Sequence, residues 1–235
     1  MREQKPPFSS KKSEAPRRRA PAGDNPRWIA LQVLCQVLDE GAFASLALDS
    51  AVSRAHMGSL DRRLCASLVY RTLENLYRLD FALGLYLKEP EKLPTQCRHN
   101  LRMAACQILL MDRIPPSAAV NEAVQLTRRC GQDALAGTVN AVLRRLAENR
   151  DQIPWPKAQE GAQALSVLYT VPEWLAQQLL ADYGPIEAEA ICAFRTERHA
   201  MTLRPTFGRE AEFPSLSGLS TGSKSLSLSK CSFIH

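Results

Sequence analysis

Residues 117–146 read SAAVNEAVQLTRRCGQDALAGTVNAVLRRL and contain two helical patterns in succession. In the first, Val120, Ala123 and Val124 recur at the three- and four-residue spacing of one helix face, and Gly131 ends the pattern. The second has the most regular apolar stripe in the chain: Leu135, Val139, Val142, Leu143 and Leu146. Two amphipathic helices joined by a short glycine turn are expected to pack side by side.

The same helical spacing extends back to Asn25, where the ordered part is expected to begin. Asn is a favourable helix N-cap, Pro26 suits the first helical position, and Gly41 is a stop signal. Further helices are expected over 43–56, over 59–87 with a break near Asp80, and around 97–108. No stretch alternates with period two for long enough to predict a strand. The sequence therefore predicts an all-α fold, a bundle of about seven helices over 25–150 followed by a short helical linker region.

Charge is distributed unevenly along the 235 residues. The first 25 carry seven basic and three acidic side chains, so +4 of the net charge of +6 lies there, among several prolines. Such a segment cannot bury apolar surface and is expected to be disordered. Two functions remain open for it: a grip on phosphates, or a solubilising tail.

These patterns divide the chain into four regions. They are a disordered basic arm (1–25), a helical domain (26–150), a linker region with two further helices (151–204) and a disordered tail (205–235). The linker helices are expected over 172–183 and 185–198. The tail is rich in serine and shows neither a helical period nor a usable core.

Several classes of protein are excluded by what the sequence lacks. No apolar run reaches the roughly 18–20 residues of a membrane span, and no secretory signal is expected. The seven cysteines include no CxxC pair, which favours reduced thiols in a cytoplasmic protein. Cys97 and His99 lie two apart on a predicted helix and face different ways, so no metal site is expected. Known nucleotide-binding, metalloprotease and hydrolase motifs do not occur, and no catalytic residue is predicted.

Polar residues flank the apolar stripes of the two helices in 117–146. Asn121 and Arg128 share a flank of the first helix, and Asn140 and Arg144 share a flank of the second. Amides and planar guanidinium groups suit phosphates and base edges, which favours RNA binding. The alternative is that the asparagines brace packed helices and the arginines are merely solvated. The predicted RNA-binding residues are Arg17, Arg18, Arg19, Arg27, Asn121, Arg128, Asn140, Arg144 and Arg145.

The segments Val120–Val124 (VNEAV) and Val139–Arg144 (VNAVLR) resemble the paired signature of NusB-like domains. More closely, they resemble the domain at the front of the bacterial ribosomal RNA cytosine-5 methyltransferases called RsmB, Sun or Fmu. The resemblance covers about residues 26–204, and further matching segments are RWIAL (27–31), LVY (68–70), ACQIL (105–109) and LYTVPEWL (168–175). One departure is Glu74, where the family usually has a basic residue.

The resemblance implies a domain that positions ribosomal RNA for methylation. It also implies S-adenosylmethionine, but only in a catalytic domain that this chain lacks, because Pro205 begins the serine-rich tail where that domain would start. The chain therefore looks truncated, and Cys231 is not expected to be a nucleophile. A catalytic half encoded separately is one possible partner. The alternative function is that of a transcription antitermination-type NusB relative acting with a ribosomal protein.

Overall fold

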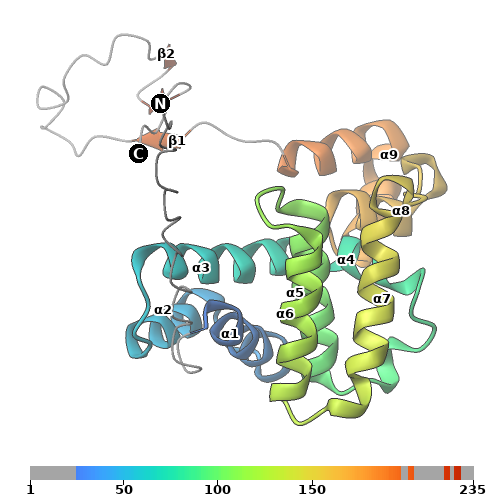
Figure 1. Ribbon diagram of the computed structural model, residues 1–235. Helices are drawn as coiled ribbons and strands as arrows, with labels where there is room; N and C mark the ends of the chain where they lie inside the picture. The colour runs from blue at the N-terminus through green and yellow to red at the C-terminus, as the bar shows by residue number, and fades with distance from the viewer. Residues whose placement is uncertain (1–24, 197–200, 204–219, 223–224, 229–235) are drawn as a thin grey trace, which may run out of the picture. The chain divides into compact units, whose positions relative to one another are not determined.

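The computed structural model describes residues 25–196, 201–203, 220–222 and 225–228 (Figure 1). Contacts divide the chain into two units, Met1–Pro156 and Lys157–His235. In the described part of the first unit, seven α-helices joined by short connections form a bundle. The prediction of an all-α fold is confirmed.

Helix α1 (Pro26–Glu40) begins and ends where the sequence indicated. The Asn25 side chain accepts hydrogen bonds from the backbone N–H groups of Arg27 and Trp28, at 2.9 and 3.4 Å. This is the N-cap arrangement that satisfies donors without a partner inside the helix. Gly41 follows the last turn with φ of 71°, a left-handed conformation that favours glycine.

Three more helices complete the first half of the bundle: α2 (Ala44–Arg54), α3 (Ser59–Glu74) and α4 (Leu76–Gly84). The predicted break near Asp80 is wrong, since the chain leaves the helical conformation at Asn75, with φ of −117° and ψ of 20°. The Asn75 side-chain amide donates to the Arg71 carbonyl at 2.8 Å. Asparagine competes in this way with the helical backbone, which makes it a frequent residue at helix ends.

Helix α5 (Thr95–Leu110) lies in the middle of the bundle, with ten of its sixteen residues buried. It packs against α1, α3, α4, α6 and α7. Helices α6 (Pro116–Arg129) and α7 (Ala136–Glu148) lie side by side along it (Figure 1). A short 3-10 helix, η2 (Asp133–Leu135), precedes α7. Two other 3-10 helices are η1 (Pro90–Lys92), between α4 and α5, and η3 (Arg150–Gln152), after α7.

The bundle has two apolar clusters that meet at α5. One is formed chiefly by α1, α2 and α3, and it is completed by Met103 from α5 and Leu126 from α6. The other is formed by α4, α5, α6 and α7 together with Ile153. Leu143 and Leu146 of the predicted stripe are fully buried in this second cluster.

The second unit contains η4 (Ala158–Glu160), α8 (Ala162–Tyr169) and α9 (Glu173–Thr196). Helix α8 was not predicted. Helix α9 is two helices joined at a kink, because Gly184 has φ of 77° and Pro185 follows it. Leu165 of α8 packs against Ala176 and Ala188 on the two halves of α9.

Three short strands were also not predicted. They are β1 (Met201–Leu203), β2 (Ser220–Gly222) and β3 (Ser225–Leu228), which pair antiparallel in the order β1-β3-β2. Strands β2 and β3 fall inside the segment 205–235, for which the composition predicted disorder. The remainder of that segment and nearly all of the arm 1–25 lie outside the described residues.

Candidate nucleic-acid interface

The outward faces of α6 and α7 carry the polar residues singled out by the sequence. On α6 the buried residues are Ala119, Val120, Ala123, Leu126 and Thr127. At 100° per residue this places Asn121 and Arg128 on the opposite side of the helix, and both are exposed. On α7, Arg144 is exposed and Asn140 is half-buried.

None of these four side chains makes a hydrogen bond or an ion pair within the part of the chain that the structure describes. The alternative that Asn121 and Asn140 brace the bundle is therefore wrong. An asparagine that does brace the bundle is Asn100 on α5, which is 1% exposed. Its amide donates to the Ala123 carbonyl at 2.8 Å and to the Thr127 hydroxyl at 3.0 Å, and so joins α5 to α6.

Two other predicted RNA-binding residues, Arg145 and Arg27, do not share the outward face of Asn121, Arg128, Asn140 and Arg144. Arg145 is exposed, but it follows Arg144 directly and therefore points about 100° away around α7. Arg27 is half-buried, and its Nε donates to Oε1 of the buried Gln107 at 2.8 Å. The Nε group of Arg27 is therefore already hydrogen-bonded inside the bundle and is not available to RNA. Arg17, Arg18 and Arg19 lie outside the described residues.

The three tryptophans have unlike roles. Trp28 lies under the Arg129 guanidinium, 4.1 Å from the ring centroid. Trp155 stacks on Phe81 at 5.7 Å and is also contacted by Arg78 at 4.6 Å, which holds the end of the first unit to α4. Trp174 is 67% exposed on α9.

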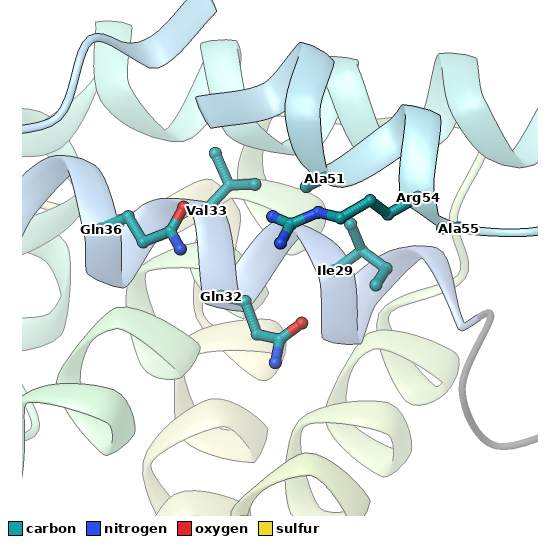
Figure 2. A pocket seen from close by; sticks show the side chains of 7 residues that line it. All are labelled: Ile29, Gln32, Val33, Gln36, Ala51, Arg54 and Ala55. Atoms are coloured by element: carbon teal, nitrogen blue, oxygen red, sulfur yellow. The ribbon is translucent and has the colours of Figure 1, made fainter. Parts of the chain in front are cut away.

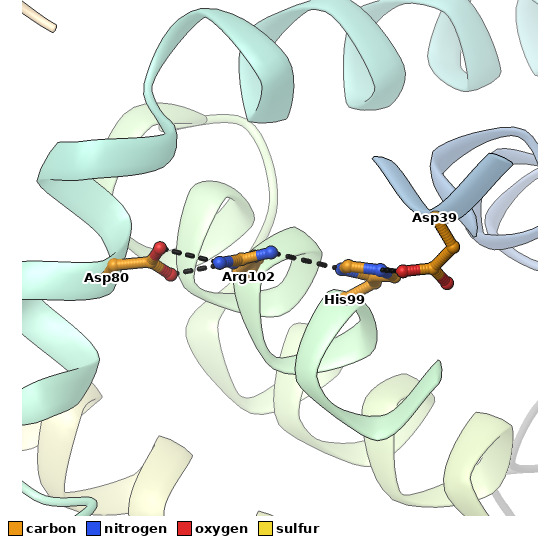
Figure 3. Close-up of polar contacts among 4 residues, drawn as sticks. All are labelled: Asp39, Asp80, His99 and Arg102. Atoms are coloured by element: carbon orange, nitrogen blue, oxygen red, sulfur yellow. Dashed lines mark hydrogen bonds and ion pairs between the residues drawn. The ribbon is translucent and has the colours of Figure 1, made fainter. Parts of the chain in front are cut away.

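A chain of polar contacts crosses the bundle from α4 through α5 to α1 (Figure 3). Arg102 binds Asp80 in bidentate fashion, with Nε donating to Oδ1 at 2.7 Å and Nη2 to Oδ2 at 2.6 Å. Its Nη1 lies 3.2 Å from Nδ1 of His99, and Nε2 of His99 lies 2.9 Å from Oδ1 of Asp39. Arginine only donates, so Nδ1 accepts and the proton of the neutral ring is on Nε2, donated to Asp39.

This proton position bears on the group of possible metal ligands at the same place. Atoms of Cys35, Asp39 and His99 lie within 4.8 Å of one another. Cys35 and Asp39 are one helical turn apart on α1, so their spacing in the sequence could have indicated that these two side chains lie together. His99 comes from α5 and could not have been found in this way. A metal ion would have to displace the Nε2 proton, and burial raises the pKa of the Cys35 thiol to about 11. These residues fit a hydrogen-bonded helix contact better than a metal centre.

Other buried thiols are equally protonated. Burial raises the pKa of Cys65, Cys97 and Cys106 to about 11. The thiolate is the reactive form of cysteine, so at neutral pH these three are poor nucleophiles.

The His99 contact gives the stability of the protein a pH dependence. Burial is the largest influence on His99 and lowers its pKa below 6.5, and the charges of Arg102 and Arg98 act in the same direction, against the bond to Asp39. At a pH above the pKa of His99 in the unfolded chain, the ring is neutral in both the folded and the unfolded state. As the pH falls through about 6.5, the unfolded chain binds a proton before the folded one does, so the free energy of unfolding decreases.

We expect this decrease in urea unfolding curves measured between about pH 7.5 and 5.5, and a smaller one in a His99→Gln variant. Parallel pH dependences in the two proteins would show that His99 titrates alike in the folded and unfolded states.

Comparisons with known proteins agree with this architecture. Residues 24–148 match the NusB family. A Bacillus subtilis (strain 168) protein named probable ribosomal RNA small subunit methyltransferase B is 31% identical over 179 residues, which cover 76% of this chain and 40% of that protein. The Thermus thermophilus protein named ribosomal RNA small subunit methyltransferase B is 36% identical over 161 residues, covering 68% of this chain and 36% of its own length.

Two solved structures are similar to this chain at low sequence identity. T. maritima NusB has a TM-score of 0.49 at 20% identity, over 55% of this chain and 92% of its own. The crystal structure of PH0851 has a TM-score of 0.56 at 18% identity, over 83% of this chain and 42% of its own. No helix within the described ranges is long and apolar enough to cross a membrane. With the family match over residues 24–148, the chain belongs to the NusB family and carries the NusB-like domain of homologues named ribosomal RNA small subunit methyltransferase B.

Proposed function

We propose that this chain binds ribosomal RNA through the outward faces of α6 and α7. The observation that carries the proposal is that Arg128 and Arg144 are exposed on neighbouring helices and lack a carboxylate partner in the described part of the chain. An exposed guanidinium without a partner keeps its donors available, and their planar arrangement matches phosphate oxygens. Asn121 and Asn140 beside them add amides that can read base edges.

The names of the relatives support this substrate class. The chain spans about 40% of the length of the Bacillus relative, so the methyltransferase activity in that name is not transferred to the chain as a whole. We propose that this domain positions RNA, and that S-adenosylmethionine and the methyl transfer belong to a separate methyltransferase domain.

The alternative, an antitermination-type factor acting with a ribosomal protein, is less supported. The similarity to the methyltransferases extends over 179 residues, well beyond the NusB region of residues 24–148.

The Arg144→Ala variant is expected to bind a structured ribosomal RNA fragment roughly tenfold more weakly than the unchanged chain, because one charge-assisted contact to the RNA is lost. Filter-binding titrations at fixed salt measure the change. Asn140→Ala is expected to weaken binding less and to leave the thermal melting temperature within about 2 °C, because its amide bonds to no described residue.

Arg63→Ala is the matched control, since Arg63 is also exposed but lies on α3, which does not pack against α7. Equal affinities for the Arg144→Ala, Arg63→Ala and unchanged proteins would contradict the assignment of this face to RNA. A fall in melting temperature for Arg144→Ala would instead indicate a structural role.

A further inference from the structure

A groove between α1 and α2 is lined by none of the residues assigned above (Figure 2). Its cavity volume is about 390 Å³, within the range of small-ligand sites. It is lined by Ile29, Gln32, Val33, Gln36, Ala51, Arg54 and Ala55.

The floor of the groove is apolar. Ile29 and Val33 of α1 are 9% and 0% exposed, and both belong to the first apolar cluster. Ala51 and Ala55 contribute only methyl groups from the α2 side. Helix α1 also packs against α3 and α5, so the position of this floor is set by the packing of the bundle.

The rim of the groove is polar. Gln36 and Arg54 reach toward one another from the two helices, and Gln32 lies on the outer side of α1 (Figure 2). Arg54 Nε donates to the Ser50 carbonyl at 3.1 Å, which orients the guanidinium and leaves its two terminal nitrogens available. Neither glutamine side chain makes a hydrogen bond to another described residue.

The charge of the groove favours an electron-rich or anionic ligand. None of the seven lining residues is acidic, and Arg54 has no ion-pair partner among the described residues. A cationic ligand would gain nothing here, whereas a phosphate would meet one unpaired guanidinium.

We propose that this groove binds an unpaired nucleobase of RNA together with its phosphate. The apolar floor covers one face of the base, the Gln32 and Gln36 amides offer a donor and an acceptor to its edge, and Arg54 binds the phosphate. Bases inside an A-form duplex cannot enter, because their edges are paired and their faces stacked. The proposal rests on the proposed function, to which it adds a second contact point and a preference for single-stranded loops.

The test uses the whole chain and two RNA probes that share one stem, a hairpin with an unpaired loop and a fully paired duplex. Gln36→Leu and Arg54→Met keep the size of each side chain and remove its polar group. We expect each to weaken binding of the hairpin by roughly tenfold and to leave binding of the duplex unchanged. Gln96→Leu on α5 is the control: Gln96 is an exposed glutamine outside the groove, whereas Gln36 is half-buried, and the substitution is expected to change binding of neither probe.

Photo-crosslinking gives a second measurement on the same proteins. A 4-thiouridine in the hairpin loop is expected to crosslink to the peptides that contain Ile29–Gln36 or Ala51–Ala55. The groove proposal is overturned if Gln36→Leu binds the hairpin as tightly as the unchanged chain and the 4-thiouridine crosslinks to other peptides. Both results are expected if the natural occupant of the groove is a peptide rather than RNA. Failure of the proposed function has a different result, since Arg144→Ala would then bind both probes normally.

Discussion

Replacing Asn100 with alanine is expected to lower the free energy of unfolding by about 2–3 kcal/mol. The variant loses two buried hydrogen bonds that join α5 to α6, of 2.8 and 3.0 Å. Each such bond contributes about 0.5–1.5 kcal/mol, and the space left by the amide adds to the loss. Oδ1 of Asn100 is buried without a partner, which keeps the effect below that of a fully satisfied amide. Urea unfolding curves measure the change.

Asn121→Ala and Asn140→Ala are the matched controls, and both are expected to change the free energy of unfolding by less than about 0.5 kcal/mol. If either control lowered the free energy of unfolding as much as Asn100→Ala does, the loss could not be attributed to the hydrogen bonds of Asn100 between α5 and α6.

Replacing Arg17, Arg18 and Arg19 together with glutamine is expected to weaken binding to every RNA by about 100-fold near 0.1 M salt. Each lost phosphate contact removes about 0.7–0.9 from the slope of log K against log salt concentration, so three contacts remove roughly 2–3. Filter-binding titrations over a series of salt concentrations give both quantities. The loss is expected to be uniform across RNAs, because phosphate contacts do not distinguish sequence.

Substitution of the same three arginines with lysine preserves the charge and is expected to preserve the slope. A glutamine variant with the salt slope of the unchanged protein would assign the arm to solubility, the other function that its composition permits.

Local signals in the sequence predicted several helix ends correctly. Asn25 and Gly41 act on backbone groups within a few residues of themselves, so their effect does not depend on the rest of the fold. Gly131 follows the end of α6 and has φ of 73°, a conformation that glycine adopts without strain whatever packs around it. The stripe from Val139 to Leu146 was readable because burial on one side imposes the helical period.

Contacts between residues far apart in the chain could not be predicted from the sequence. The sequence indicated that an asparagine could brace the bundle, but the choice of Asn100 depends on how α5 and α6 are placed against each other. Nothing near His99 in the sequence identifies Asp39 as its partner, sixty positions away. The groove between α1 and α2 was missed because Gln36 and Arg54 belong to different helices and share no sequence pattern.

The central position of α5 also has a consequence for synthesis on the ribosome. Helices α1, α2 and α3 are made first, but their apolar cluster includes Met103 of α5 and Leu126 of α6. The nascent chain therefore carries its first three helices with an open apolar face until α6 has emerged. Domains generally fold as units during translation, and such exposed surface is prone to aggregation. This places the period of greatest risk before residue 126 has left the exit tunnel, and it favours protection of the emerging chain by a chaperone during that interval.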